Sequence, residues 1–341
     1  MSKYLKLLAA VVVLMIVSVG VAYRNFFGSA VHESAIVYLS TTDLQTKGYE
    51  QVIDSAILPH MSHHKAFDIY AKRLNLPQKI RSGRYQLSEG QSVMDVVRIL
   101  KLGIQEPIIL KFNNIRTPGQ LASRLSLQIE ADSTIIMQAL ESPEILNKVG
   151  VKNREEMLAI FIPNSYEVYW NITPESLIQR MKTEHSRFWN ETREQKRKEL
   201  NLSQLEVSTL ASIVYEETAR EDEMARVAGV YVNRLKRGMK LQADPTVKYA
   251  MGDFELKRIL HKHLKYDSPY NTYRYGGLPP TPIAMPSIAA IDAVLNYEKH
   301  KYLFFCARPE FDGYHNFAQT LVQHNANSRA YSAELNRRNI K

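Results

Sequence analysis

The sequence predicts an α+β protein that begins with one transmembrane helix and continues into a small α+β subdomain and a C-terminal α+β domain. Residues 7–23 form an uncharged apolar run, residues 35–105 alternate short strand and helix patterns, and residues 210–245 have the pattern of two amphipathic helices. The chain has 341 residues, of which 45% are hydrophobic and 23% charged, so two folded units with ample core are expected.

The apolar run from Leu7 to Tyr23 contains seventeen residues without a charge, just enough for a helix to cross the hydrocarbon core of a membrane. A cleaved signal peptide is the alternative, because Gly20 and Ala22 are small enough for a cleavage site. The Tyr-Arg-Asn-Phe-Phe that follows does not favour cleavage. We therefore expect an uncleaved anchor.

The charges that flank this run predict its orientation. Lys3 and Lys6 lie on the short N-terminal side, so residues 1–6 are expected in the cytoplasm and everything after the anchor outside. Arg24, on the far side of the run, weakens this asymmetry.

The charge balance and the absence of nucleic-acid-binding motifs favour a membrane surface or an acidic polymer over a nucleic acid as the anionic partner. The net charge is +9, from 44 basic and 35 acidic residues, which suits a membrane surface or a polymer that bears carboxylates. The basic residues are scattered, and no RNP, helix-turn-helix or zinc-finger pattern occurs in the sequence. We expect no nucleic-acid binding.

The small subdomain is predicted from four segments. The β-rich AIVYL at 35–39 and GRYQL at 83–87 predict strands, and HHKAFDIYAKRLNL predicts a helix that runs up to Pro77. A second helix is expected to begin after Ser92 as its N-cap and to stop at Gly103.

A mixed region follows, with a strand expected at 107–112, a helix from about Thr117 to Leu127 and another helix from Pro174. Its segment FIPNSYEVYW, residues 161–170, contains aromatic residues that are expected either in a core or in the lining of a cleft. The strongly charged residues 184–200 predict a solvated helix or linker.

The first helix of the C-terminal domain carries an unusual carboxylate. Leu210, Ile213, Val214 and Glu217 are spaced i, i+3, i+4 and i+7, so Glu217 shares the apolar face, whereas Glu216 points about 120° away and is expected to be solvated beside Thr209 and Ser212. Burial disfavours the charged form of a carboxyl, so Glu217 has the property of a proton donor near neutral pH.

A structural role for Glu217 remains open on periodicity alone, and is the favoured interpretation at that level. The carboxylate would then cap the next helix or pair with Arg220 or Arg226. Perturbed carboxylates mark functional sites only as a tendency.

The second helix is well bounded, with Glu221 to Glu223 in its first turn and Lys236 and Arg237 in its last turn before Gly238. Gly229 in its middle lowers helix stability relative to alanine, so we expect another element to approach closely there.

Three later segments complete the domain. LQADPT is expected to place Gln242 and Asp244 in a loop, and the irregular, tyrosine-rich stretch 266–286 is expected to form the wall of a cleft. Cys306 lies in the apolar run 302–307, which predicts a buried strand with the cysteine in the core.

The sequence predicts no metal site and no cofactor. A single cysteine excludes an intrachain disulfide, and neither a G-x-S-x-G nor a Cys-His pattern offers a nucleophile. The histidines lack metal-ligand spacing, so they are expected to be solvated. They are His60, His63, His64, His261 and His263.

Several motifs then occur in one order: A-S-I-V-Y-E-E-T, V-A-G-V-Y-V-N-R-L, L-Q-A-D-P-T-V, S-P-Y-N-T-Y, G-L-P-P and a closing H-N-F…T…H-N from His315 to Asn325. In this order and spacing the chain resembles the endolytic murein transglycosylases of the MltG (YceG-like) family. The resemblance extends over nearly the whole chain, from the apolar run to the closing motif.

The resemblance implies the domain organisation and the setting. It implies a LysM-like subdomain at 35–105 that holds or orients glycan, although a spacer is an equal alternative, a connecting part at 106–203 and a catalytic domain at 204–341. The anchor at 7–23 would hold the catalytic domain on the periplasmic side of a bacterial inner membrane, with peptidoglycan synthases as implied partners.

The resemblance also implies the reaction and its residues. Glu217 matches the family's catalytic glutamate and would cleave the β-1,4 bond between N-acetylmuramic acid and N-acetylglucosamine of nascent peptidoglycan, giving 1,6-anhydro ends and terminating strand elongation. The residues expected to bind substrate are Gln242, Asp244, Asn271, Tyr273 and Tyr166. The chain departs from the family pattern at Thr281, Met285 and Ser287, which puts the substrate contacts of that loop in doubt.

Two other functions compete with this one. A hydrolysing muramidase needs a second carboxylate near Glu217, and Asp244 is the best candidate. A membrane-anchored, peptidoglycan-binding scaffold would leave Glu217 with a structural role.

Overall fold

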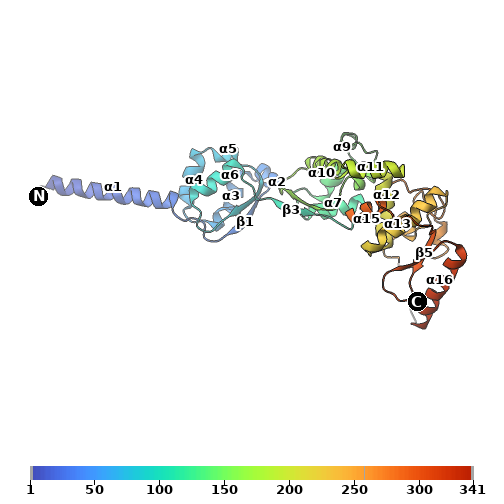
Figure 1. The fold of residues 1–341 in the computed structure, drawn as a ribbon. Helices are drawn as coiled ribbons and strands as arrows, with labels where there is room; N and C mark the ends of the chain where they lie inside the picture. Colours follow the sequence, from blue (N-terminus) through green and yellow to red (C-terminus); the bar gives the residue numbers. More distant parts are fainter. Residues whose placement is uncertain (1–2, 257, 339–341) are drawn as a thin grey trace. The chain divides into compact units, whose positions relative to one another are not determined.

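The computed structural model describes residues 3–256 and 258–338, which form an α+β protein of two compact units (Figure 1). The first unit contains the first 110 residues together with 128–131 and 166–172. The second contains residues 111–127, 132–165 and the chain from Thr173 onward. The units are therefore not consecutive ranges, because two short segments of the region 106–203 belong to the first unit.

The N-terminal helix α1, Lys3–Phe27, contains the whole predicted apolar run. None of its residues is buried, and within the described residues it is the one helix long and apolar enough to cross a membrane. Its last turn contacts the folded part of the first unit, where the rings of Phe26 and Tyr70 meet edge to face with centroids 6.2 Å apart.

The first unit is built around the antiparallel pair β1, Ala35–Leu39, and β2, Gly83–Leu87, in which Ala35 lies opposite Leu87. Both strands have the predicted bounds. Alternate residues of each strand point into a core that the helices of the unit complete. These helices are α2 Thr41–Thr46, α3 Gly48–Ala56, η1 Leu58–His60, α4 His64–Arg73, α5 Leu76–Lys79 and α6 Val93–Leu102.

Local signals predicted both ends of α6 and the start of α4 correctly, but not the end of α4. Ser92 and Asp95 form a capping box at the start of α6, and Gly103 ends the helix with φ +66°. The helix predicted to reach Pro77 instead ends at Arg73, because Asn75 adopts a left-handed conformation (φ 58°) and Pro77 lies in the first turn of a separate short helix. Helices α2 and α3 were not predicted from the sequence.

The intermediate region contains one small sheet and several helices. Its strands are β3 Ile108–Lys111 and β4 Ser165–Val168, and its helices are α7 Pro118–Ser126, α8 Ser133–Glu141, α9 Pro143–Val149, η2 Glu156–Ala159, α10 Pro174–Phe188 and α11 Glu191–Leu200. The predictions for β3, α7 and the start of α10 are confirmed. No residue of α11 is buried, as predicted, but Trp189 before it is buried and donates from Nε1 to His185 Nε2 at 3.0 Å.

The core of the second unit surrounds helix α12, Gln204–Glu217 (Figure 1). Every residue from Val207 to Val214 is buried against neighbouring elements of the unit. These later elements are α13 Glu221–Lys236, α14 Asp244–Met251, η3 His263–Lys265, α15 Ile288–Leu295, β5 Phe304–Ala307, β6 His315–Ala318 and α16 Leu321–Arg337.

The face of α12 that was expected to be solvated is also buried. Ser212 donates to Thr209 O at 2.7 Å and accepts from Ile283 N at 3.0 Å, so the segment around Ile283 covers this face. The stretch 266–286 contains no helix or strand, as predicted, yet much of it packs into the core.

Gly229 confirms the predicted close approach on α13. A Cβ atom at this position would collide with the backbone oxygen of Glu298 and would lie 2.6 Å from His300 Nε2. The segment that follows α15 therefore packs directly on the backbone of α13.

Candidate active site

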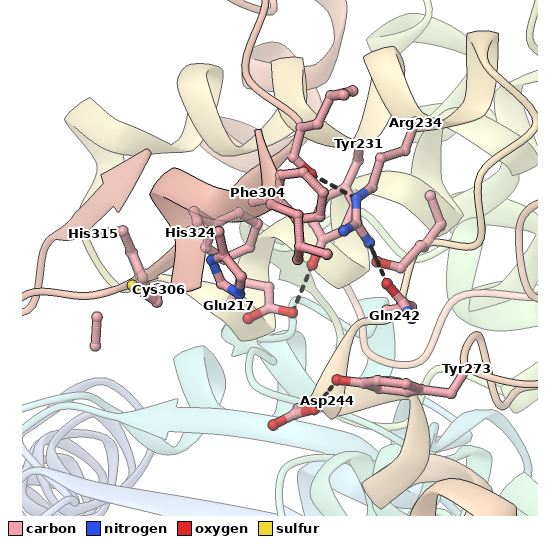
Figure 2. Close-up of a pocket in the computed structure, with 15 residues that line it drawn as sticks. Glu217, Tyr231, Arg234, Gln242, Asp244, Tyr273, Phe304, Cys306, His315 and His324 are labelled. Carbon is pink, nitrogen blue, oxygen red and sulfur yellow. Dashed lines mark hydrogen bonds between the residues drawn. The ribbon is translucent and has the colours of Figure 1, made fainter. Parts of the chain in front are cut away.

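The second unit contains a pocket of about 450 Å³, within the size range of small-ligand sites (Figure 2). Its wall combines polar side chains from α12, α13 and α14 with β5, β6 and α16. The lining residues are Glu217, Tyr231, Arg234, Leu241, Gln242, Asp244, Tyr273, Leu303, Phe304, Phe305, Cys306, Ala307, His315, Leu321 and His324.

Glu217 is the last residue of α12 and extends the buried stripe of Leu210, Ile213 and Val214 into the pocket. The pKa of its carboxyl is raised to about 7, mainly by burial. A hydrogen bond from Tyr231 lowers this pKa, and the nearby charge of Asp244 raises it. At neutral pH a large fraction of Glu217 is therefore protonated, as a general acid requires.

Tyr231 holds this carboxyl in place. Its hydroxyl donates to Glu217 Oε1 at 2.7 Å, and its buried ring meets Phe305 edge to face (Figure 2). Tyr231 was not predicted as a site residue, although Met224, Val227, Ala228 and Tyr231 repeat on α13 the spacing that selected Glu217 on α12.

Asp244 has a tyrosine partner of its own, since Tyr273 donates to its Oδ1 at 2.6 Å. Asp244 was expected in a loop, but it is the first residue of α14, and Pro245 behind it suits the first turn of a helix. Gln242 does lie in the preceding loop, with φ +53°, and Glu217, Gln242, Asp244 and Tyr273 all line the same pocket.

Arg234, also not predicted as a site residue, is buried beside this group. Its Nε donates to Leu303 O at 2.7 Å, and its Nη1 donates to Leu241 O at 2.7 Å and to Gln242 Oε1 at 3.2 Å. The guanidinium thus ties the loop before α14 to the chain entering β5.

The opposite edge of the pocket contains His315 and Cys306. The Nδ1 atom of His315 lies 2.7 Å from Oε2 of the buried Glu223, and its backbone N–H donates to Oε1 at 2.9 Å. Cys306 was expected in the core, but it is only half-buried on β5 and lines the pocket, where burial raises the pKa of its thiol.

Two predicted substrate-binding residues do not line the pocket. Asn271 is 0% exposed, and its Nδ2 donates to Leu264 O and Tyr266 O at 3.1 and 2.7 Å, which stabilises the loop. Tyr166 is buried on β4 and belongs to the first unit. Of the other aromatic residues in its segment, Phe161 packs against Phe112, and Trp170 meets Tyr38 edge to face at 4.9 Å.

The surroundings of Glu216 and Glu217 also differ from those predicted. Glu216 is not a freely solvated residue, because it forms a half-buried ion pair with Arg116 at 2.9 Å outside the pocket. The arginines considered for Glu217 are engaged elsewhere, Arg226 with Glu298 at 2.9 Å and Arg220 with Asp312 O.

The family departures lie away from the pocket wall. Thr281 is buried and forms a hydrogen bond of 2.7 Å with Tyr270, Met285 is buried, and Ser287 caps α15. Residues 3–256 and 258–338 contain no group of three or more potential metal ligands. His263, expected to be solvated, is buried and accepts from Leu260 N at 3.1 Å.

The fold and the pocket define an α+β protein that presents a protonatable carboxyl to a polar and aromatic site. The chain belongs to the YceG-like family, which matches residues 47–330.

Curated relatives support this assignment. The endolytic murein transglycosylase of Bacillus subtilis is 30% identical over 289 residues, covering 80% of this chain and 78% of the relative. The Streptococcus pneumoniae protein of the same name is 31% identical over 279 residues and covers 72% of this chain, but the match spans only 50% of that protein. The crystal structure of a yceG-like protein from Listeria monocytogenes aligns with a TM-score of 0.58 and 25% identity, covering 86% of this chain and 98% of that one.

Proposed function

We propose that this chain is an endolytic transglycosylase that cleaves peptidoglycan strands, with Glu217 as the general acid and then the general base. The raised pKa of Glu217, about 7 in a pocket that holds it through Tyr231, is the observation that carries the proposal. The names of the curated relatives supply the substrate class.

The proposed reaction needs one carboxyl. Neutral Glu217 protonates the oxygen that links N-acetylmuramic acid to the departing N-acetylglucosamine, and the C1–O bond breaks. The resulting carboxylate takes the proton of the muramic C6 hydroxyl, whose oxygen bonds to C1 and forms a 1,6-anhydro end. Glu217 is then protonated again and no water is consumed. Tyr231 donates to the carboxyl throughout and so favours the ionised form between the two steps.

A hydrolysing muramidase is the second candidate, because Asp244 lines the same pocket as Glu217. Paired carboxyls in unlike environments are the usual arrangement of glycoside hydrolases, in which the second carboxylate acts on water or on the sugar. Tyr273 holds Asp244 in a defined orientation for that role. The ends of the released strands distinguish the two reactions, since hydrolysis leaves reducing ends.

The proposal extends to the setting of the enzyme. The apolar helix α1 would anchor it in the cytoplasmic membrane with residues 1–6 inside, supported by Lys3 and Lys6. The α+β region 35–105 would hold glycan as a LysM-like subdomain, and cleavage beside a synthase would end the elongation of nascent strands.

A matched pair of variants tests the chemistry. We expect Glu217→Gln to lose about 10² to 10⁴ in rate or more, because one group serves as both acid and base. Glu216→Gln makes the same chemical change at the neighbouring residue, which lies outside the pocket, so the variant should still cleave. It should lose some stability, because the ion pair with Arg116 is broken. Mass spectrometry of strands released from purified peptidoglycan should show 1,6-anhydro ends.

Other outcomes reject parts of the proposal. Undiminished cleavage by Glu217→Gln would assign the acid to another residue, and reducing ends from the unaltered protein would favour hydrolysis. Glycan binding together with normal cellular function in Glu217→Gln would indicate a scaffold.

A further inference from the structure

Arg234 is a buried cation that lacks a counter-ion. It is 7% exposed, and in the described part of the chain its hydrogen bonds go only to uncharged oxygens, three of the backbone and one of the Gln242 amide. No carboxylate of residues 3–256 or 258–338 forms an ion pair with it. A buried charge without a partner is strongly unfavourable, so such sites normally acquire one.

The guanidinium is only partly used by the fold. Nε and Nη1 make all four of these hydrogen bonds, and among the described residues Nη2 donates to no acceptor. Because the guanidinium is a rigid planar fork, fixing two nitrogens also fixes the direction of the third. Arg234 lines the pocket, and Figure 2 shows its guanidinium beside Tyr231 and Gln242.

The groups around Arg234 do not neutralise it. Glu217, whose pKa is raised to about 7, forms its hydrogen bond with the Tyr231 hydroxyl and not with Arg234. Asp244 is held by Tyr273 instead. Arg234 is also the only arginine or lysine among the pocket-lining residues that the structure describes.

Aromatic rings line the pocket wall next to Arg234. The guanidinium lies 5.2 Å from the ring centroid of Phe304, and the His324 ring stacks on that phenyl at 5.3 Å with an interplanar angle of 22°. Burial and the charge of Arg234 lower the pKa of His324, so this imidazole stays neutral and adds no charge to the wall.

We propose that Arg234 anchors a carboxylate subsite in this pocket, in which Nη2 donates to an acidic group of the glycan strand near the bond to be cleaved. The inference rests on the proposed function and adds a specificity to it. In a peptidoglycan strand the carboxylate has two sources, the lactyl group of a muramic acid that has lost its stem peptide and the carboxyls of an intact stem peptide. Strands that carry neither would bind weakly.

Binding to three defined probes tests the subsite without cleavage. The full chain with Glu217→Gln, purified in detergent micelles, is titrated with peptide-bearing strands, with peptide-free strands that expose the lactyl carboxylate, and with peptide-free strands whose carboxyl has been reduced to an alcohol. We expect the reduced strands to bind about tenfold or more weakly, and the difference to shrink at high salt. Tighter binding of peptide-free strands would assign the lactyl group, and tighter binding of peptide-bearing strands the stem.

Equal binding of reduced and acidic strands overturns the inference and leaves the proposed function intact, whereas no binding of any strand rejects both. Variants on one helix localise the effect: Arg234→Gln should bring the acidic-to-reduced affinity ratio close to one, while Arg226→Gln, outside the pocket in an exposed pair with Glu298, should leave it unchanged. Because Arg234 also stabilises two loops, the probe comparison in the Glu217→Gln protein decides the question if Arg234→Gln fails to fold.

Discussion

At the scale of single residues, the proton affinity of Glu217 is set by competing neighbours. Burial is the largest influence and raises the pKa, the Tyr231 hydrogen bond lowers it, and the charges of Asp244 and Glu216 raise it again. Because the acid must be protonated to act, kcat/KM should fall as the pH rises through about 7.

The fall of kcat/KM at high pH, which is the alkaline limb of the pH profile, should shift in opposite directions in two variants. Tyr231→Phe removes a donor that favours the carboxylate, so the pKa of Glu217 rises and the limb moves to higher pH. Asp244→Asn removes a nearby negative charge, so the pKa falls and the limb moves to lower pH. Profiles of kcat/KM against pH measure both shifts.

Shifts of the same sign in the two variants would contradict this account, as would a limb that neither variant moves. The position of the limb, rather than the rate at its plateau, is the readout, because both side chains line the pocket and their loss also affects substrate binding.

The sequence predicted the orientation of Glu217 but not its surroundings. Helical spacing identifies the residues that share a face, and Glu217 does extend the buried stripe. The same spacing cannot say what covers the opposite face, so Glu216 and Ser212 were assigned to solvent although Arg116 and the segment around Ile283 lie against them. Arg234 was missed because three of its four acceptors are backbone oxygens, which no side-chain pattern reveals.

At the scale of secondary-structure elements, the absence of a side chain at Gly229 lets a second chain segment pack against the backbone of α13. The Glu298 carbonyl occupies the space that a side chain would fill, and Arg226 one turn earlier pairs with the side chain of the same glutamate. The contact fixes the path of the chain between α15 and β5, and β5 contributes to the pocket wall.

Gly229→Ala should therefore destabilise the protein by about 1–3 kcal/mol, although alanine favours a helix by about 1 kcal/mol. Gly119→Ala in α7 is the matched control, because the nearest atom to its added Cβ is Thr117 Oγ1 at 3.9 Å. We expect the control to stabilise by up to about 1 kcal/mol. Denaturant unfolding measures the change in the free energy of unfolding in both variants. A stabilising Gly229→Ala would show that the segment around Glu298 can move away at little cost.

Element boundaries were predictable where the signal was local. Ser92 and Gly103 bound α6 through their own capping geometry, which lies within a few residues of sequence. The end of α4 depends instead on the left-handed conformation of Asn75, which breaks an apolar pattern that continues to Pro77. Periodicity described the pattern but not the break.

At the scale of the whole molecule, residues 29–31 connect the N-terminal helix to the core of the first unit. Ser29 pairs with Ser92 and Val31 pairs with Met61 in isolated bridges, and Ala30 and Val31 are buried. The residues before Phe26 contribute none of the buried core.

Deleting residues 1–25 should therefore give a soluble, folded protein that still cleaves soluble strands. Deleting residues 1–31 also removes both bridges and two core side chains, so its unfolding midpoint should be clearly lower. Circular dichroism and thermal melts compare the two. An unfolded first deletion would mean that the apolar helix is part of the core.

The division into units was not evident from local patterns. Glu130 N donates to Trp170 O at 2.8 Å, and this link between two short segments, distant in sequence, helps to hold both in the first unit. Pairing across such separations is set by the tertiary fold, which helix and strand periodicities do not encode.

The placement of the pocket residues along the chain has a consequence for biosynthesis. Glu217 and Tyr231 precede His315 and His324 by 84 to 107 residues in the chain, yet these late residues, together with β5, form one wall of the same pocket. A ribosome-bound intermediate that stops short of β5 carries the acid without the wall that confines a substrate. The proposed enzyme would thus remain latent while its chain is being made, and would gain the ability to cut the cell wall only after residue 324 has emerged and folded.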